Sequence, residues 1–564
     1  MTELKTPFEQ NALGAWDVHP DPQFRRKSFI SLCGEWELSV RKDGDETYLG
    51  RILVPYPPES RLSGIGRALE KGEKYLYRRS FSLEGENLGE RVILHFGGVD
   101  QIAEVSLNGR PVGSHEGGYL PFEFDVTELL RSGENRLEVT VTDELDRDLA
   151  WGKQRRRRGG MWYTPVSGIW QSVWLEGLPK NHFRSVKITP DLSGIALEVC
   201  GGENEKTVTL ADGRVYRFKG EKTYIAIDSP RLWSPESPYL YDFTLSDGCD
   251  EVESYFALRT VSVEKRNGRR VICLNGEPYF FHGLLDQGYF PDGIYTPATP
   301  EALENDVLQM KALGFNMLRK HIKIEHKLFY YYCDRHGMAV FQDMVNSGGY
   351  SFLVDTALPT VGLKRGISHR ASPRRREMFK RDSEQTLSYL YNHPSVVCYT
   401  VFNEGWGQFD ADGNYLRLKA LDPSRVWDAT SGWFHGRHSD VQSEHVYFKK
   451  LNLKSDGRRP LLLSEFGGYS YKVEGHSFNL DKTYGYRFFA DREEFCSALE
   501  ALYLDQVVEM IGRGLCGAVY TQVSDVEDET NGLLTYDRQV LKVDPERMLR
   551  IADRIKKTFY KTWA

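Results

Sequence analysis

The sequence has no paired cysteines, no long apolar run and no excess of basic residues. Its eight cysteines are scattered, without a CxxC pair or a metal-ligand spacing, which argues against a disulfide framework and predicts buried free thiols in a reducing compartment. No apolar run is long enough to span a bilayer, and the first residues lack a signal-peptide pattern. We therefore expect a cytoplasmic protein without a membrane partner.

Basic and acidic residues nearly balance. The 73 Lys and Arg residues against 80 Asp and Glu residues give a net charge of -7, so no domain-wide basic surface indicates nucleic-acid binding. Two cationic runs, at residues 155–158 and 374–376, are expected to be solvated loop or helix faces. Aromatic residues make up 13% of the chain, and flat rings suit carbohydrate surfaces as well as cores.

The first half of the chain has the pattern of β-structure. With 564 residues, the chain is too long for one hydrophobic core. From about residue 30 to 178, polar and apolar residues alternate between glycine-containing turns, which predicts an antiparallel sandwich. Residues 179–263 are again strand-like and have the length of a small immunoglobulin-like sandwich. The long Gly- and Trp-rich segment 151–174 is too irregular for a strand and is expected to be a loop.

From residue 264 on, helical and short apolar segments alternate. About eight strands alternating with helices over some 300 residues predict a (β/α)8 TIM barrel. A doubly wound open sheet is the alternative, although no Gly-rich phosphate loop follows the first strand. The predicted domains are therefore residues 1–178, 179–263 and 264–564. The strands after the first are expected at residues 316–321, 338–343, 395–402, 425–429, 441–447, 460–464 and 515–522.

Two glutamates stand at the ends of predicted barrel strands. Glu404 follows the apolar run at residues 395–402, the fourth strand, and Glu465 follows residues 460–464, the seventh. Residues after strand C-termini face the catalytic end of such a barrel, so the two carboxylates should converge. A facing pair of carboxylic acids is what cleavage of a glycosidic bond requires. The alternative is that each glutamate only terminates a buried strand.

Several motifs resemble glycoside hydrolase family 2, which includes β-galactosidases, β-glucuronidases and β-mannosidases. Asn403-Glu404 resembles the acid/base motif of that family, and the Ser464–Gly467 segment, SEFG, resembles its nucleophile motif. The resemblance covers nearly the whole chain, at residues 22–38, 96–127, 256–263, 274–287 and 314–321. It implies a jelly-roll sugar-binding-like domain, an immunoglobulin-like domain and a catalytic TIM barrel.

The resemblance also implies roles for individual residues. Glu465 would attack the anomeric carbon, and Glu404 would protonate the leaving oxygen and later activate water. Asn403 would hold the sugar 2-hydroxyl, and Arg319 and Tyr447 would lie beside Glu465. Asp286, Asp343, Trp433, His435 and Gln522 are at positions where substrate hydroxyls would be bound. His321 and His435 lack ligand spacing for a metal, and we expect no metal or other cofactor.

No subgroup of the family is matched completely. The β-glucuronidases carry an Asn-x-Lys element where this chain has Asn531-Gly532-Leu533. The chain also departs from typical β-galactosidases at Asp286-Gln287 and Gln342-Asp343, and the latter pair is closer to β-mannosidases. The acidic residues 525–529 could bind a cation or sugar hydroxyls, but a solvated loop is expected there.

The sequence therefore predicts an exo-acting retaining β-glycosidase. Its partner would be a carbohydrate or glycoconjugate, with β-galactosidase-like activity favoured over a β-mannosidase or a β-uronidase. A non-catalytic carbohydrate-binding protein and a structural assembly protein are alternatives from other classes. Residues 151–165 are expected to extend from the jelly roll over the barrel and shape the site, and a homo-oligomer is possible.

Overall fold

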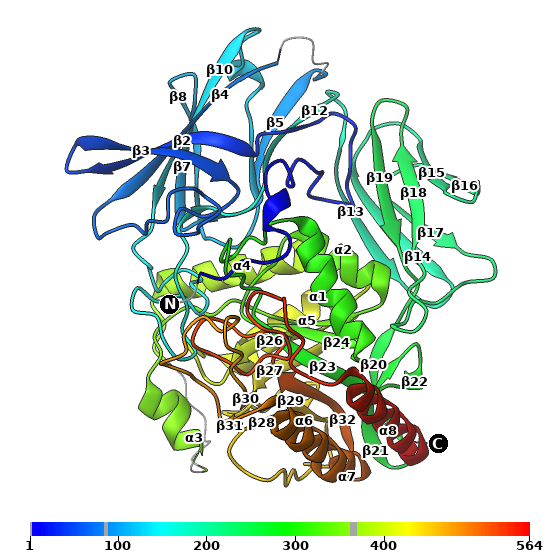
Figure 1. Ribbon diagram of the computed structural model, residues 1–564. Coiled ribbons are helices and arrows are strands. Elements are labelled where there is room, and N and C mark those ends of the chain that lie inside the picture. The colour runs from blue at the N-terminus through cyan, green and yellow to red at the C-terminus, as the bar shows by residue number, and fades with distance from the viewer. Residues whose placement is uncertain (1–2, 84–87, 361, 363–368, 564) are drawn as a thin grey trace.

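The chain folds into two β-sandwiches packed on a barrel. A computed structural model describes residues 3–83, 88–360, 362 and 369–563. In Figure 1 the two sandwiches, drawn in blue to cyan and in green, lie above the barrel, which is formed by the second half of the chain. The predicted multidomain fold of two sandwiches and a TIM barrel is confirmed.

The N-terminal sandwich has the predicted alternation of buried and exposed side chains. In β10 (Glu134–Thr142), Leu137, Val139 and Val141 are buried, whereas Glu138 and Thr140 are partly exposed. One sheet has the order β1-β12-β5-β9 and the other β3-β2-β4-β10-β7-β8, with a short pair β11-β6 beside them. The other strands are β1 Phe29–Ser31, β2 Gly34–Lys42, β3 Asp45–Val54, β4 Lys74–Ser82, β5 Arg91–Phe96, β6 Val99–Asp100, β7 Ile102–Leu107, β8 Arg110–Glu116, β9 Phe122–Asp125, β11 Gly168–Ile169 and β12 Val173–Leu178.

The second sandwich is smaller and has its own apolar core. Its sheets have the orders β13-β14-β17 and β16-β15-β18-β19, and a three-stranded sheet, β20-β21-β22, leads into the barrel. The strands are β13 Phe183–Pro190, β14 Gly194–Gly201, β15 Lys206–Leu210, β16 Val215–Phe218, β17 Lys222–Ala226, β18 Tyr241–Ser246, β19 Glu251–Phe256, β20 Val261–Arg266, β21 Arg269–Leu274 and β22 Glu277–Pro278.

Eight parallel strands form the nearly closed barrel. The hydrogen-bonded order is β27-β26-β25-β24-β23-β32-β29-β28, so β26 is the fourth strand along the chain and β29 the seventh, as predicted. The barrel strands are β23 Phe281–Asp286, β24 Met317–Lys320, β25 Ala339–Asp343, β26 Val396–Asn403, β27 Val426–Ser431, β28 Gln442–Val446, β29 Leu461–Gly467 and β32 Leu515–Thr521.

Helices cover the outside of the barrel through apolar stripes. In α8 (Pro545–Trp563), Met548, Ile551, Ile555 and Phe559 are buried at a spacing of three or four residues. No helix among the residues described above is long and apolar enough to cross a membrane. The other helices are α1 Pro300–Ala312, α2 Lys327–His336, α3 Leu358–Thr360, α4 Pro373–Leu390, α5 Ala411–Leu421, α6 Arg492–Ala501 and α7 Val508–Gly512.

Three expectations about exposure are wrong at some or all of their residues, although Arg374 and Arg376 are exposed as expected. Cys249 is exposed and Cys200 partly exposed, whereas the other six cysteines are buried free thiols. Arg375 is buried in α4, where it donates hydrogen bonds to the backbone oxygens of Ser347 and Gly407. The acidic segment 525–529 is also buried, because residues 158–164 from the first sandwich cover it.

Candidate active site

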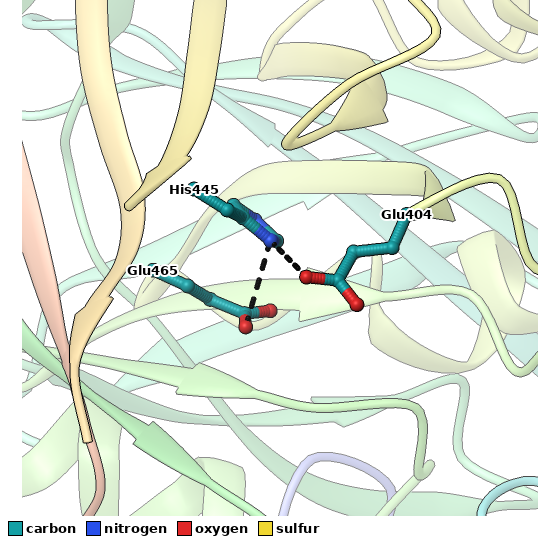
Figure 2. A group of neighbouring side chains, drawn as sticks. All are labelled: Glu404, His445 and Glu465. Atoms are coloured by element: carbon teal, nitrogen blue, oxygen red, sulfur yellow. Dashed lines mark hydrogen bonds and ion pairs between the residues drawn. The ribbon is translucent and has the colours of Figure 1, made fainter. Parts of the chain in front are cut away.

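Glu404 lies directly after β26, at the C-terminal end of the barrel. Its backbone is in the left-handed region, with φ of 51°, a conformation that costs free energy for a residue with a side chain and is often found at functional sites. Two contacts hold it there: Glu404 N donates to Ser431 O at 2.9 Å, and Trp433 Nε1 donates to Glu404 O at 3.2 Å. Its side chain faces His445 and Glu465 (Figure 2).

Glu465 lies within β29 rather than after it. The predicted strand ends at Ser464, whereas β29 continues to Gly467 because its pairing with β28 and β32 persists through Phe466. Arg319 Nη1 donates to Glu465 Oε1 at 3.0 Å, and Tyr447 Oη donates to Glu465 Oε2. Both neighbours predicted for Glu465 therefore contact its carboxylate.

Arg319 connects four strands of the barrel. This buried guanidinium donates to both oxygens of Asp343, at 2.9 and 3.0 Å, and to Asn403 Oδ1 at 2.9 Å, in addition to Glu465. Burial opposes the ionised form of Asp343, but Arg319 and His321 lower its pKa to about 2. The Asn403 amide nitrogen is buried and has no hydrogen-bond partner among the described residues, so it can donate to a hydroxyl of a bound sugar.

His445, in β28, lies between the two glutamates and was not predicted from the sequence. Its Nδ1 is 2.6 Å from Glu404 Oε1 and 3.6 Å from Glu465 Oε2, and Figure 2 shows the ring facing both carboxylates. Its Nε2 is 3.0 Å from Ser431 Oγ, which donates to Ser464 Oγ. His445 precedes Tyr447 by two residues, so the period of a strand would place the two side chains on one face.

Glu404 and Glu465 differ in the charges and hydrogen-bond donors that surround their carboxyl groups. Burial raises the pKa of Glu404 to about 7, although the charges of Lys153 and Arg319 oppose this rise. Burial also raises the pKa of Glu465 above its usual value, and the positive charges of His445 and Arg319 oppose that rise. Glu404 therefore keeps its proton in a large fraction of molecules up to about pH 7, whereas the carboxylate of Glu465 accepts hydrogen bonds from Arg319 and Tyr447.

The separation of the carboxyl groups is short. One oxygen of Glu404, one of Glu465 and a ring nitrogen of His445 lie within 4.8 Å of one another. Retaining glycosidases place their carboxyl groups about 5–5.5 Å apart, and inverting enzymes about 6.5–9.5 Å. The same three groups could offer ligands to a metal ion, but Glu465 already contacts a guanidinium and a phenol. We interpret the group as an acid/base centre.

Other predicted residues surround this centre. Asp286, at the end of β23, pairs with Lys320 Nζ at 2.7 Å, so its carboxylate is already neutralised. Gln522 donates to Asn531 Oδ1 at 2.8 Å, and its own Oε1 is buried without a partner in the protein. The Trp433 ring lies edge-on to His445, at 5.6 Å between centroids. His435 lies beside Thr430 and Glu444.

Two further buried groups near the centre were not predicted. Asp428, in β27, accepts a hydrogen bond from Ser443 at 3.0 Å, and burial raises its pKa to about 6. Trp406, two residues after Glu404, is buried, and its indole N–H has no hydrogen-bond partner in the part of the chain that the structure describes. An aspartate inside a strand and a tryptophan in a loop have no sequence pattern that separates them from core residues.

The loop from the first sandwich reaches this end of the barrel. Here the jelly-roll loop means residues 151–165. Trp162 lies 5.4 Å from Trp406 and 5.4 Å from Trp151, measured between ring centroids. Tyr163 Oη donates to Glu529, and Thr164 N donates to Glu527 at 3.0 Å. The expectation that this loop extends over the barrel agrees with these contacts.

Comparison with known domain families identifies the same family along the chain. Residues 67–173 match the glycosyl hydrolase 2 galactose-binding domain-like family, residues 182–259 match glycosyl hydrolases family 2, and residues 266–540 match the TIM barrel domain of that family. A β-galactosidase of Aeromonas hydrophila is 28% identical over 437 residues, covering 70% of this chain and 40% of the relative. A putative β-glucuronidase of Formosa agariphila is 26% identical over 442 residues, covering 73% of this chain and 38% of the relative.

Solved structures have the same fold over nearly the whole chain. A β-glucuronidase from an uncultured Clostridium sp. superposes with a TM-score of 0.75 at 19% identity, covering 96% of this chain and 99% of the other. A β-galacturonidase from Eisenbergiella tayi gives 0.68 at 20% identity, covering 95% and 98%. The chain spans about 40% of the length of the curated relatives named above. On the three domain matches, the chain belongs to glycoside hydrolase family 2.

Proposed function

We propose that the protein is an exo-acting retaining β-glycosidase. The observation that carries this proposal is the short separation of Glu404 and Glu465 at the C-terminal end of the barrel, where one oxygen of each lies within 4.8 Å of the other. The raised pKa of Glu404 and the hydrogen bonds from Arg319 and Tyr447 to Glu465 support an acid and a nucleophile, respectively.

The proposed reaction has two displacements. An oxygen of Glu465 forms a bond to the anomeric carbon while the glycosidic bond breaks, and Glu404 gives its proton to the leaving oxygen. Glu404 then takes a proton from water, which attacks the anomeric carbon and releases Glu465. Asn403 has a free amide N–H toward the 2-hydroxyl, where hydrogen bonds strengthen in the transition state.

His445 is proposed to position the proton of the acid. The Nε2 atom of His445 lies 3.0 Å from Ser431 Oγ and 3.5 Å from Arg319 Nη1, and its Nδ1 atom faces Glu404 at 2.6 Å. One proton then lies between the imidazole and the carboxyl group. Substrate binding would release that proton to the glycosidic oxygen.

The glycone is proposed to have the configuration of galactose. The relatives that support this are β-galactosidases, including that of Aeromonas hydrophila. A β-uronide is the second candidate, because Lys153 is buried, its charge acts on Glu404, and its ammonium group has no carboxylate partner within the described chain. The proposed substrate-binding residues are Asn403, Arg319, Tyr447, Asp286, Asp343, Trp433, His435 and Gln522.

The test combines a substrate panel with the stereochemistry of the product. Aryl β-galactoside, β-galacturonide, β-glucuronide, β-mannoside and β-glucoside would be assayed with the wild type and with Glu465→Gln. We expect turnover of at least one substrate, first release of the β-anomer by proton NMR, and loss of that turnover in the variant. Turnover that survives in Glu465→Gln would contradict the mechanism, and a protein that binds sugars without any turnover would be a binding protein.

A further inference from the structure

A buried lysine of the jelly-roll loop has no counter-ion. Lys153 is only 6% exposed, and within the described chain no carboxylate or other acceptor lies at hydrogen-bonding distance from its ammonium group. The Nζ atom lies 5.4 Å from the ring centre of Trp406 and 5.6 Å from that of Tyr163. A buried charge is costly unless it is paired, and aromatic rings compensate only part of that cost. The ammonium is therefore available to an anionic group of a bound molecule.

This ammonium lies on the side of the site that holds the proposed acid. Trp406, which Lys153 contacts, follows Glu404 by two residues. The charge of Lys153 acts on the barrel residues around it: it opposes the rise in the pKa of Glu404, and it adds to the burial that lowers the pKa of His321 to about 3. Lys153 therefore belongs to the electrostatic environment of the site, although it comes from another domain.

One other buried cation around the end of the barrel, Arg375, has no carboxylate partner among the described residues, but it donates hydrogen bonds to Ser347 Oγ and to the backbone oxygens of Ser347 and Gly407. The remaining buried cations there are neutralised. Each has at least one carboxylate partner within 3.2 Å: Arg319 with Glu465 and Asp343, Lys320 with Asp286 and Glu325, Lys323 with Glu325, and Lys542 with Asp525. The segment Asn531-Gly532-Leu533 supplies no cation, and Leu533 is fully buried. Among the described residues that face this end, Lys153 is thus the buried cation available to substrate.

A second cation of the same loop lies farther out. The Arg155 guanidinium lies 3.8 Å from the ring centre of Trp162 and 5.4 Å from that of Tyr350. Its Nε is buried without a hydrogen-bond partner, and no carboxylate of the described chain pairs with it. The loop therefore brings two uncompensated positive charges to the site, which favours an anionic substrate over a neutral one.

We propose that Lys153 binds the carboxylate of a β-linked uronic acid. Lys153 is the deeper of the two cations, with 6% of its surface exposed, whereas Arg155 is partly exposed. We therefore assign the carboxylate to the glycone. Combined with a galactose configuration, this describes a β-galacturonide, from which a β-glucuronide differs only at C4. The proposal rests on the proposed glycosidase function and specifies its substrate class.

The test compares acidic and neutral substrates with Lys153 variants. The wild type should hydrolyse aryl β-galacturonide or β-glucuronide with at least about 100-fold higher kcat/KM than aryl β-galactoside. Lys153→Met should lower the uronide kcat/KM by about 100-fold and leave the galactoside value within about threefold. Lys153→Arg retains the charge and should lose less. Arg157→Met, at an exposed position of the same loop, is the matched control and should change neither value.

Further measurements distinguish binding of a glycone carboxylate by Lys153 from other roles of this residue. A carboxyphenyl β-galactoside carries the anion on the leaving group. If Lys153→Met lowered kcat/KM for this substrate more than for the uronides, Lys153 would bind a carboxylate of the aglycone, and the assignment would be overturned. An equal loss for all substrates would make Lys153 a positioning residue for Glu404 and also overturn it. Calorimetric titration with free galacturonate and glucuronate tests the same contact without turnover, and thermal unfolding of each variant checks its fold.

The same measurements distinguish failure of the glycosidase proposal from failure of the anion site at Lys153. If no glycoside is turned over but uronates bind the wild type and not Lys153→Met, the glycosidase proposal fails and the anion site stands. If a neutral galactoside is the preferred substrate and Glu465→Gln abolishes its turnover, the glycosidase proposal stands and the anion site fails.

Discussion

Glu404 and Glu465 have the same side chain, but their neighbours give them different properties. Burial raises the pKa of Glu404 to about 7, whereas Arg319 and Tyr447 both donate hydrogen bonds to Glu465. A carboxyl group that keeps its proton near neutral pH, beside one whose ionised form has hydrogen-bond donors, suits a general acid and a nucleophile. The surroundings, rather than the residue type, thus support the roles proposed for the two residues.

The pH dependence of activity should report the pKa of Glu404. We expect kcat/KM for a substrate with a poor leaving group to fall as pH rises through about 7, because Glu404 must be protonated to act as the acid. Glu404→Gln should remove this limb and lower kcat/KM about 100- to 10,000-fold. A 2,4-dinitrophenyl glycoside needs little proton donation and should be affected far less. An unchanged basic limb in the variant would assign the pKa to another group.

The Glu404 carboxyl group should stabilise the folded protein at low pH, whereas a salt-bridged acid stabilises it at high pH. Its pKa is raised from 4.5 to about 7 on folding, so its stabilising contribution is complete below about pH 4.5 and is lost as pH rises through about 7. Glu404→Gln stays neutral at every pH. The free energy of unfolding of the variant, relative to wild type, should therefore increase between pH 5 and pH 8 in urea titrations. An equal difference at both pH values would contradict this.

His445 should affect the pKa of the proposed nucleophile, Glu465. Burial raises the pKa of Glu465, and His445 opposes that rise when its imidazole carries the proton that it shares with Glu404; Glu465 must be ionised to attack. His445→Gln should therefore move the acidic limb of the kcat/KM profile to higher pH. His438→Gln changes an exposed histidine on the neighbouring loop and should leave the profile unchanged. A lower rate in His445→Gln with the same acidic limb would indicate a purely structural role.

The sequence predicts the two glutamates of this centre, although Glu465 lies inside β29 rather than after it, and it misses His445 and Asp428, which lie inside β28 and β27. Glu404 and Glu465 stand out because a charged residue at the end of an apolar run is unusual. His445 could have been found from its two-residue spacing to Tyr447, because the period of a strand that continued through Tyr447 would place both side chains on one face. Asp428 has no such relation to a recognised motif, and its contacts with Ser443 form only when β27 and β28 lie side by side.

At the scale of elements, β29 fixes the position of Glu465 through its pairing on both sides. The prediction ended this strand at Ser464, since glutamate and glycines rarely continue a buried strand. The structure extends it to Gly467, because Phe466 and Gly467 still pair with Tyr520 and Thr521 of β32. Strand pairing between distant segments is not visible in a local pattern, so the core of each barrel strand was predicted better than its end.

Gly467 should be essential to this strand end. Its φ is +84°, and a Cβ there would lie 2.3 Å from Cε2 of Tyr520. Gly467→Ala should lower the free energy of unfolding by about 2–5 kcal/mol, from backbone strain and overpacking together, and should reduce kcat through displacement of Glu465. Gly475→Ala, with φ of +78° and no atom within 4 Å, controls for backbone strain. If Gly467→Ala and Gly475→Ala lost the same stability and the same kcat, the contact with Tyr520 would be excluded as the cause.

At the scale of the whole molecule, the site is completed by contacts between domains. The acidic segment 525–529 was expected to be solvated, but Tyr163 donates to Glu529, Thr164 N donates to Glu527, and Lys542 pairs with Asp525. These partners lie as far as 366 residues away in sequence, so charge patterning alone could not reveal the burial. The predicted domain order and the barrel followed from periodicity, which is local.

Trp162 should couple the stability of the jelly-roll loop to activity. It packs between Trp151 and Trp406, and Trp406 is also one of the rings nearest Lys153, so Trp162→Ala should lower the free energy of unfolding by about 3–5 kcal/mol. Because the loop then no longer holds Lys153 and Trp406, kcat/KM at a temperature where the variant stays folded should fall about tenfold or more. Trp36→Ala removes a buried tryptophan from the core of the first sandwich and should destabilise the protein with kcat/KM unchanged. If both variants lost stability while neither lost activity, the loop would only cover the barrel and would not form part of its site.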